Sequence, residues 1–375
     1  MTRAFRIGRV FGIDIEIDYT WFIIFTIVAV GLSLGWFAKL LPNVSPGIRW
    51  AVGILTALLF FGSVLVHELS HSVVALRNDL NISGITLFLF GGVSKMTDEP
   101  KSAGVEFKMA VAGPLTSLVL AAVFIGLSVW MLPARTTPGL VLGTVFRWLG
   151  YVNGMLGIFN LLPGFPLDGG RVLRSALWGS MHDLRRATRI ASSFGEGIGV
   201  LMIVGGVFLF FAGVGFSGIW LAFIGWFLVQ AAQQSYQQML LKQTLSGVSV
   251  GQMMTTDVDV VDAYQTLDQV ADYVMTRHHP AFPVEHNGQL LGLICLQDLR
   301  SVPRENWNSV TAAQAAPPIS DHNTISPSAD AWDALIRMSQ ESCGRLLVVK
   351  DGLLQGIISR TDIMRAMRHR LQLGM

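Results

Sequence analysis

The segment His67-Glu68-Leu69-Ser70-His71 places two imidazoles and a carboxylate within five residues. Residues four positions apart share one face of an α-helix, about 6 Å apart along its axis, so both imidazoles can reach one Zn²⁺. Glu68 lies beside them, where it can take a proton from a water molecule at the metal and deliver it to a leaving amine. The motif therefore predicts one zinc ion per chain, with His67 and His71 as ligands and Glu68 as the general base.

This motif lies inside a long apolar segment, about Ile48 to Leu76. Each of its three ionisable groups would be costly in hydrocarbon unless it were paired or bound to a metal, so an intramembrane functional site is the first hypothesis. The alternative is a polar cluster that satisfies itself and faces the interior of a helix bundle.

A catalytic zinc that is bound by two histidines lacks one protein ligand. The remaining histidines lie in polar loops or in the tail: His182, His278, His279, His286, His322 and His369. Asp168 lies near the end of another apolar segment, in the stretch N-L-L-P-G-F-P-L-D-G-G from Asn160 to Gly170. The two prolines of this stretch interrupt a helix, and Gly169 and Gly170 free the backbone, so the carboxylate can turn toward the imidazoles. By itself, such an aspartate would more often be a turn or helix-cap residue.

The composition requires that part of the chain be solvated by lipid. Of its 375 residues, 51% are hydrophobic and 14% are charged, and the mean hydropathy is +0.51. A soluble globule with so few charges could not cover its own surface. Most of six apolar segments are long enough to cross a hydrocarbon core of about 30 Å. They are about Tyr19–Phe37, Ile48–Leu76, Phe107–Leu132, Leu140–Leu161, Phe194–Ala212 and Phe216–Gln230.

The positions of the Lys and Arg residues orient these segments. Basic residues gather before the first segment, between the second and third, and between the fourth and fifth, whereas the other loops are poor in charge. By the positive-inside rule, this distribution over six spans places both termini in the cytosol, in a plasma or inner membrane. Residues 1–239 carry a net charge of +5 and residues 240–375 a net charge of −3. Because no surface is strongly basic, we expect no nucleic-acid partner.

Two stretches on the cytosolic side have the pattern of extended chain. Isoleucines alternate with acidic residues over Ile13–Asp18, and Ile82–Val93 is rich in β-branched and aromatic residues. They predict a small sheet or a re-entrant hairpin at the membrane, which requires that protein or water satisfy the backbone.

Beyond a polar linker at residues 233–249, the tail contains a repeat. A shift of 64 residues aligns the two copies without a gap, for example Asp298 with Asp362. Each copy predicts a strand, a helix, two strands around an Asn-Gly or Asp-Gly turn, and a second helix. One copy is too small to bury a good core, so we expect residues 250–306 and 307–371 to pack together.

This repeat resembles the CBS-domain pair over about residues 246–371. The best match is G-I-I-S-R-T-D from Gly356 to Asp362. The resemblance implies that Ser359 and Asp362 contact the ribose and phosphates of an adenine nucleotide such as ATP. In the first copy Cys295 replaces the hydroxyl residue, which argues against nucleotide binding in that half. The resemblance also allows a structural module without ligand, or a homodimer formed through the CBS domains.

The segments H-E-L-S-H and N-L-L-P-G-F-P-L-D-G-G together resemble the site-2 protease family of intramembrane zinc metalloproteases. The resemblance covers roughly residues 1–230, which we assign to a membrane domain of residues 1–232. It implies that His67, His71 and Asp168 are the zinc ligands and that Glu68 is the general base.

Three further segments match motifs of that family. Asn160 matches an asparagine that is implicated in holding the extended substrate, and Ala112-Gly113-Pro114-Leu115 resembles the third-helix motif. Phe90-Gly91-Gly92-Val93 resembles the re-entrant loop, so Gly91 and Gly92 are expected at the substrate. A substrate helix must unwind before it is cleaved, and the edge of Ile82–Val93 could receive it as an added strand. Proline at Leu87 or Leu89 would then impair cleavage.

We therefore expect a polytopic α-helical membrane protein with about six transmembrane helices and a small membrane-associated β element, followed by a cytosolic α+β CBS pair. The leading hypothesis is a zinc endopeptidase that cleaves a membrane-anchored protein in the lipid bilayer, under control of adenine nucleotide. Two alternatives remain, namely a transporter or channel gated by the CBS pair, and a metal-binding scaffold without catalysis.

The chain contains two cysteines, Cys295 and Cys343, both in the polar tail. We expect them to act as small apolar residues and not to form a disulfide, because no oxidising compartment is indicated.

Overall fold

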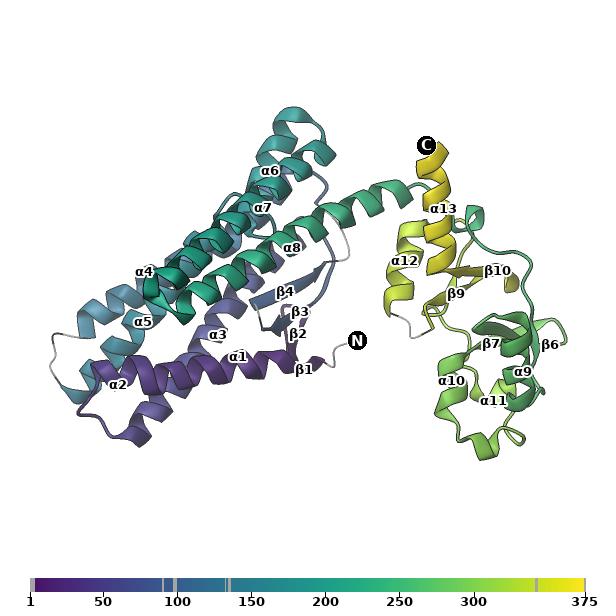
Figure 1. Ribbon diagram of the computed structural model, residues 1–375, viewed down its shortest axis with the longest axis horizontal. Helices are drawn as coiled ribbons and strands as arrows, with labels where there is room; N and C mark the ends of the chain where they lie inside the picture. Colours follow the sequence, from purple (N-terminus) through teal and green to yellow (C-terminus); the bar gives the residue numbers. More distant parts are fainter. Residues whose placement is uncertain are drawn as a thin grey trace. The chain divides into compact units, whose positions relative to one another are not determined.

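The computed structural model describes residues 4–89, 91–96, 100–131, 133, 136–340 and 343–373, with only the backbone of residues 340 and 369–373. Phe90 and Leu132 lie outside these residues, as does the side chain of His369. The chain forms two compact units, Met1–Met239 and Leu240–Met375 (Figure 1).

The first unit is built mainly from long helices. They are α1 (Tyr19–Val30), which continues through a π-helical segment (Gly31–Trp36) into α2 (Phe37–Leu40), α3 (Pro46–Leu76), α4 (Ala103–Met131), α5 (Thr137–Asn160), α6 (Asp168–Met181), α7 (Leu184–Leu209) with a further π-helical segment (Phe210–Val214), and α8 (Phe216–Leu245).

Five helical segments of the described chain are long and apolar enough to cross a membrane. They are Tyr19–Leu40, Pro46–Leu76, Ala103–Met131, Leu184–Val214 and Phe216–Leu245. The fourth predicted span corresponds to α5, which is long enough but more polar, because Arg147, Tyr151 and Asn153 lie along it. The predicted fold class is confirmed, with five helices and not six that qualify by length and composition.

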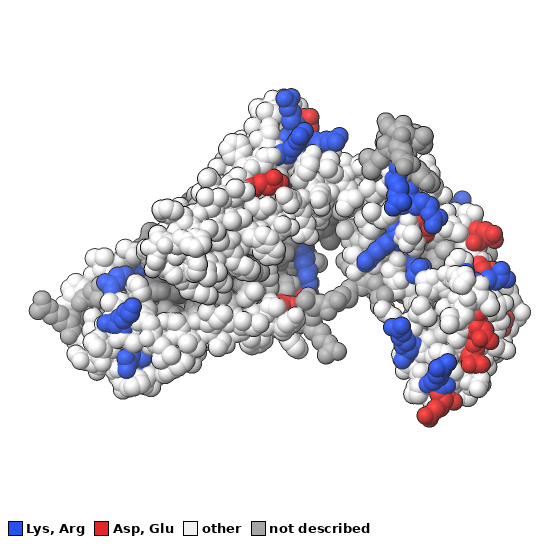
Figure 2. All heavy atoms as spheres, viewed as in Figure 1, with Lys and Arg blue, Asp and Glu red and all other residues white. Residues whose placement is uncertain are grey.

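Helix α4 is the central element of the bundle. It packs against α3, α5 and α6, and these helices run alongside one another in Figure 1. Along most of their length the helices are covered by uncharged side chains (Figure 2). Large apolar side chains on α7 point outward, with Leu201 73% and Phe208 71% exposed. An outward face of this kind suits lipid as its solvent.

The first unit also contains a four-stranded sheet. Its strands are β1 (Ala4–Val10), β2 (Ile13–Asp18), β3 (Ile82–Phe88) and β4 (Gly91–Met96), in that spatial order, with β2 and β3 parallel. Ile13, Ile15 and Ile85 form its buried core. The two stretches predicted to be extended are confirmed, whereas strand β1 was not predicted.

The sheet order corrects the predicted docking edge. Strand β3 pairs with β2 on one side and with β4 on the other. A substrate strand therefore cannot pair with β3 at Leu87. Within the described sheet the free edges belong to β1 and β4. Proline at Leu87 would break the sheet itself and would not test docking.

The tail consists of two copies of one small α/β domain, as the repeat predicts. The first contains β5 (Val261–Asp262), α9 (Leu267–Arg277), β6 (Ala281–His286), β7 (Gln289–Cys295) and α10 (Leu296–Ser301). Short helices follow, η5 (Arg304–Asn306) and α11 (Ala312–Ala315), and η4 (Val250–Gln252) precedes it. The second contains β8 (Thr324–Ile325), α12 (Ala331–Gln340), β9 (Arg345–Lys350), β10 (Leu353–Ser359) and α13 (Arg360–Leu373).

The hairpin of each copy turns where the sequence predicts it. Asn287 and Gly288 have φ of 49° and 79°, and Asp351 and Gly352 have φ of 52° and 80°. Two successive positive φ angles are typical of the tight turn that matches the twist of a β-hairpin. The two copies share an apolar cluster, to which β7 and β9 both contribute, so the prediction that they pack together is confirmed.

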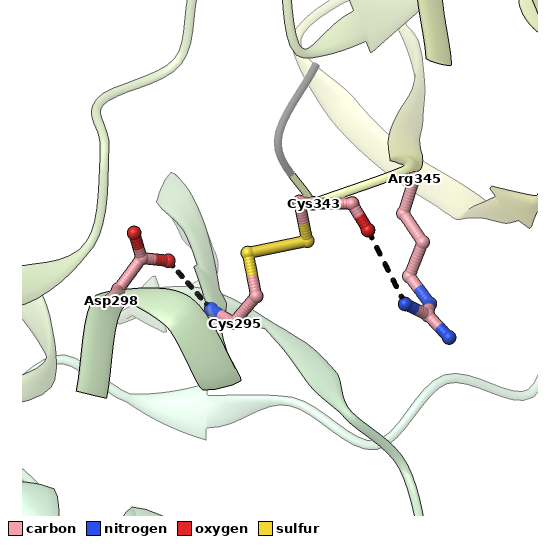
Figure 3. The surroundings of a disulfide bond; sticks show 4 residues. All are labelled: Cys295, Asp298, Cys343 and Arg345. Carbon is pink, nitrogen blue, oxygen red and sulfur yellow. Dashed lines mark hydrogen bonds between the residues drawn. A yellow bond between two sulfur atoms is a disulfide. The ribbon is translucent and has the colours of Figure 1, made fainter. Parts of the chain in front are cut away.

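The expectation for the two cysteines is wrong, because Cys295 and Cys343 form a disulfide (Figure 3). Their Cα atoms lie 6.1 Å apart, although 48 residues separate them in the sequence. Cys295 ends β7 of the first copy and Cys343 precedes β9 of the second. Packing of one copy on the other brings them together, which a reading of each cysteine in its own copy cannot show.

Candidate metal centre

Three side chains from two helices converge at one point in the membrane unit. His67 and His71 lie on α3, and Asp168 is the first residue of α6. Asp168 Oδ2 lies 3.2 Å from Nε2 of each imidazole, and the two Nε2 atoms lie 3.3 Å apart. Two imidazole nitrogens and a carboxylate oxygen form a donor set that zinc accepts, with the ligand count of a catalytic site.

The other ring nitrogen of each imidazole is held by α4. His71 Nδ1 donates a hydrogen bond to the carbonyl oxygen of Met109 at 2.6 Å, and His67 Nδ1 lies 2.9 Å from Ser117 Oγ. A carbonyl oxygen can only accept, so the proton of His71 is on Nδ1 and Nε2 of the neutral ring keeps its lone pair for a metal. Met109 and Ser117 are both fully buried. The residues therefore fit a zinc ion.

Gly113 makes room for this arrangement. A Cβ atom at this position would lie 2.1 Å from His71 Nε2 and 2.6 Å from His67 Nε2. Any side chain here would fill the space where the ligand atoms converge. Pro114 follows, and it interrupts the hydrogen-bond ladder of α4 in the turn that offers the Met109 carbonyl. The third-helix motif thus has a steric function at the metal centre.

The stretch before Asp168 turns the carboxylate toward α3, as predicted. Helix α5 ends at Asn160 and α6 begins at Asp168. Gly169 and Gly170 lie within α6 without positive φ angles, so they contribute through close packing and not through the backbone freedom that was predicted. A Cβ atom on Gly169 would lie 2.2 Å from the carbonyl oxygen of Leu162, and one on Gly170 would lie 2.4 Å from the backbone nitrogen of Phe165. The first turn of α6 can therefore pack directly on the preceding loop.

Glu68 lies between the metal ligands and strand β4. A Cβ atom on Gly92 would lie 2.4 Å from Glu68 Cγ, and Ser94 Oγ donates a hydrogen bond of 3.5 Å to Glu68 Oε2. Gly92 is thus in contact with the candidate base, while a Cβ on Gly91 would meet no atom within 4 Å. Gly92 and Ser94 are two residues apart, so Glu68 lies against one face of β4, a strand at the edge of the described sheet.

Cross-strand contacts fix the position of β4 in the sheet. Lys95 Nζ lies 2.5 Å from Glu16 Oε2, which also accepts a hydrogen bond from Thr86 Oγ1 at 3.0 Å. The hydrogen bond from Lys95 holds the pKa of Glu16 below its usual value. These side chains tie β2, β3 and β4 together.

Asn160, the last residue of α5, is half-buried. Among the described residues its side-chain amide has no hydrogen-bond partner, so it is available to a ligand. The role of Asn160 in holding the substrate stays a prediction. Sequence reasoning did not assign Met109, Ser117 or Ser94. The only signal for Ser117 is a polar residue in an apolar helix, and a backbone carbonyl such as that of Met109 gives none.

In the tail, the two copies hold their candidate ligand residues in the same local geometry. Ser359 N–H donates to Asp362 Oδ2 at 2.9 Å, and Cys295 N–H donates to Asp298 Oδ2 at 2.8 Å. Burial raises the pKa of Asp298, although the hydrogen bond from Cys295 opposes this. Cys295 is thus the structural counterpart of Ser359, but its sulfur is bonded to Cys343.

Two protein families match the chain. Peptidase family M50 matches residues 55–141 and 134–204, and the CBS domain matches residues 250–305 and 316–369. The first matches contain both His ligands and Asp168. The second matches cover the two copies of the repeat.

Relatives match nearly the whole chain. Zinc metalloprotease Rip3 of Mycobacterium tuberculosis is 34% identical over 97% of this chain and 93% of its own length. Zinc metalloprotease MJ0392 of Methanocaldococcus jannaschii is 30% identical over 98% of this chain and 97% of its own. The solved site-2 protease of Methanocaldococcus jannaschii is 31% identical, with a TM-score of 0.43. The match covers 62% of this chain and 95% of that structure's chain.

These relatives set aside the alternative of a transporter or channel gated by the CBS pair, since they carry both parts of the chain and are named metalloproteases. The match to Rip3 covers 97% of this chain and therefore includes both the helices around His67 and the tail repeat. This protein therefore belongs to peptidase family M50, the site-2 proteases, and is a zinc metalloprotease with a CBS-domain pair.

Proposed function

We propose that the protein cleaves a membrane-anchored protein substrate within the bilayer, at one zinc ion held by His67, His71 and Asp168. The observation that carries this proposal is the convergence of these three ligand atoms, all within 4.8 Å of one another, with both histidines on a helix long enough to span a membrane. Glu68 follows the first ligand directly and serves as the general base.

The chemistry divides between the metal and the chain. Zinc in such a site acts as a Lewis acid and makes water a better nucleophile at neutral pH. Glu68 takes one proton from the attacking water, whose oxygen forms a bond to the carbonyl carbon of the substrate peptide. Glu68 then returns that proton to the amide nitrogen as the carbon–nitrogen bond breaks. The products are a new carboxyl end and a new amine.

The free edge of β4 is the docking site that we propose for the unwound substrate. This edge adjoins Glu68 through Gly92 and Ser94, so an added strand would bring its peptide bonds beside the base. Val93, 49% exposed, offers a position for cross-linking. Val93→Cys, in a background of Cys295→Ser with Cys343→Ser, should cross-link to alternate substrate cysteines. A period of two residues supports strand addition, whereas a period between three and four would contradict it.

Zinc content tests the site itself. Elemental analysis of detergent-purified protein should give about one zinc per chain, and His71→Ala and Asp168→Ala should lose or weaken it while remaining folded. A folded wild-type protein that binds no zinc after supplementation would overturn the proposed site. Retention of full zinc affinity by Asp168→Ala would remove this residue from the ligand set.

We further propose that both termini are cytosolic, in a plasma or inner membrane, and that adenine nucleotide at Ser359 and Asp362 modulates cleavage. The basic loops support this orientation. The second copy is the half that has a hydroxyl residue, Ser359, beside its aspartate, which supports that half as the nucleotide site. Calorimetry should show ATP binding that Asp362→Ala abolishes. No heat of binding at millimolar ATP would contradict nucleotide control and leave dimerisation as the function of the tail.

A further inference from the structure

One face of α4 contacts the metal centre at several levels. Glu106, Met109, Gly113 and Ser117 are spaced by three, four and four residues, so they lie on the same side of the helix. Met109 and Ser117 hold the two imidazoles, and Gly113 leaves the space between them. These contacts account for the two histidines. Among the described residues, no hydrogen bond or ion pair joins Asp168, the third ligand, to α4.

Glu106 supplies a connection to the helix that carries the third ligand. Arg174 of α6 donates from Nε to Glu106 Oε1 at 2.7 Å, and its Nη2 also contacts that oxygen. Glu106 is only 1% exposed, and among the described residues its Oε2 has no hydrogen-bond partner. An ionised carboxylate at this depth is costly without its cation.

Arg174 also contacts the chain on the other side of Asp168. Its guanidinium carbon lies 5.1 Å from the centre of the Phe165 ring, in the loop that precedes α6. Arg174 itself lies six residues after Asp168 on the same helix. One guanidinium therefore fixes the loop before the ligand and the helix after it, and anchors both to α4.

A buried ion pair is weak evidence for stability, because well-packed apolar side chains in its place are often as stable. Two guanidinium nitrogens of Arg174 contact one carboxylate oxygen, however, and such directed contacts define position better than apolar packing does. At a metal centre this matters, because the groups behind the ligands orient them.

We propose that Glu106 and Arg174 are positioning residues, which hold the carboxylate of Asp168 in register with the two imidazoles. Helix α4 is then the common template for all three ligands. The inference rests on the proposed zinc site and adds to it the pair through which α4 positions the third ligand.

The decisive variant replaces the pair by apolar side chains of similar length, Glu106→Met with Arg174→Met. We expect it to fold with a melting temperature close to that of the wild type, since neither charge is left unpaired. Its zinc affinity, measured by competition with a chromophoric chelator, should fall about 10–100-fold. The visible spectrum of the Co²⁺-substituted protein should also change, which a role in stability alone would not cause.

A coupling experiment shows whether the pair acts through Asp168. In the wild-type background, Asp168→Ala should weaken zinc binding strongly. In the double-methionine background, the same change should cost at least about tenfold less, because the carboxylate is already displaced. Equal losses in both backgrounds would contradict action through Asp168. If the double variant does not fold, Arg174→Lys, which keeps the charge but lacks the fork, should show the same changes to a smaller degree.

Ser128→Ala is the matched control on the same helix. Ser128 lies about three helical turns after Ser117. It is 2% exposed and donates a hydrogen bond of 2.7 Å to the carbonyl oxygen of Gly143. Its loss should leave zinc affinity and the cobalt spectrum unchanged. Wild-type affinity and spectrum in the double-methionine variant would overturn the inference, whereas absence of zinc from the wild type would overturn the proposed site.

Discussion

The metal centre and the tail repeat position their polar side chains in opposite ways. His67 meets Ser117 and Asp168 across 50 and 101 residues of sequence, and both contacts cross between helices. Ser359 and Asp362, in contrast, meet across three residues and would do so in any chain that forms this turn and helix. The membrane site therefore depends on the packing of the whole bundle, while the tail site depends on a local cap that each copy forms by itself.

The largest effect should come from Glu68, the proposed general base, which follows the ligand residue His67 in the chain and is not part of the proposed ligand set. Glu68→Gln should lower the rate of cleavage about 10²–10⁴-fold, because the base that transfers the proton is lost. Zinc content should stay at one per chain. A single-turnover assay with a membrane-anchored substrate, alongside elemental analysis, measures both. Cleavage at the wild-type rate would remove Glu68 from the mechanism.

Gly113→Ala tests whether the metal centre depends on contacts between helices. One added methyl group would overlap the Nε2 atoms of both imidazoles, so zinc affinity should fall roughly 100-fold, as after loss of a supporting contact. Gly126→Ala is the matched control, because its Cβ would meet no atom within 4 Å on the same helix. Chelator competition should leave Gly126→Ala unchanged. Equal affinity in the two variants would show that the close approach at Gly113 is not needed.

The disulfide between Cys295 and Cys343 is a long-range contact of the tail. Its oxidation state also indicates on which side of the membrane the tail lies. Where Cys295 and Cys343 are oxidised, the cross-link should stabilise the tail by about 2–4 kcal/mol, so reduction should speed its digestion by protease in the wild type and not in Cys343→Ser. In a reducing cytosol the pair should be present as thiols. A membrane-impermeant maleimide should then label wild-type cells only after lysis. Labelling of intact cells would contradict the cytosolic orientation.

The smallest effect should come from the local caps. Asp362→Ala and Asp298→Ala each remove an acceptor for a backbone N–H three residues earlier, so each should cost the tail about 1 kcal/mol of stability. Zinc content should not change. Urea unfolding followed by protease susceptibility of the tail measures this. A loss of zinc in either variant would break the distinction between the two regions.

The two copies differ in the residue that precedes the last helix, which bears on the proposed nucleotide site. Ser359 has a hydroxyl that donates to Asp362, whereas Cys295 has in its place a sulfur that lies against Cys343 and is bonded to it in the structure. Burial lowers the pKa of Arg345, although the charge of Asp362 opposes this. The second copy therefore has the guanidinium of Arg345, at the start of β9, within electrostatic reach of Asp362. The second copy is therefore the better candidate for an anionic ligand.

The sequence by itself determined the features that depend on neighbours along the chain. The i, i+4 spacing of His67 and His71 needs only a helix, and the alternation over Ile13–Asp18 needs only a strand. The 64-residue repeat predicted two copies and their Asn-Gly and Asp-Gly turns, because turn chemistry is local. Asp168 could be nominated because the prolines around it exclude a continuous helix.

Only the tertiary structure decided the contacts that join distant segments. The carbonyl of Met109 bears no side-chain signal, and the choice of Arg174 as partner for Glu106 depends on how α6 packs on α4. The free edge of β4 and the disulfide of Cys295 follow from the order of strands and the packing of the two copies. Local propensities leave such pairings open, because their free energy arises only when the elements meet.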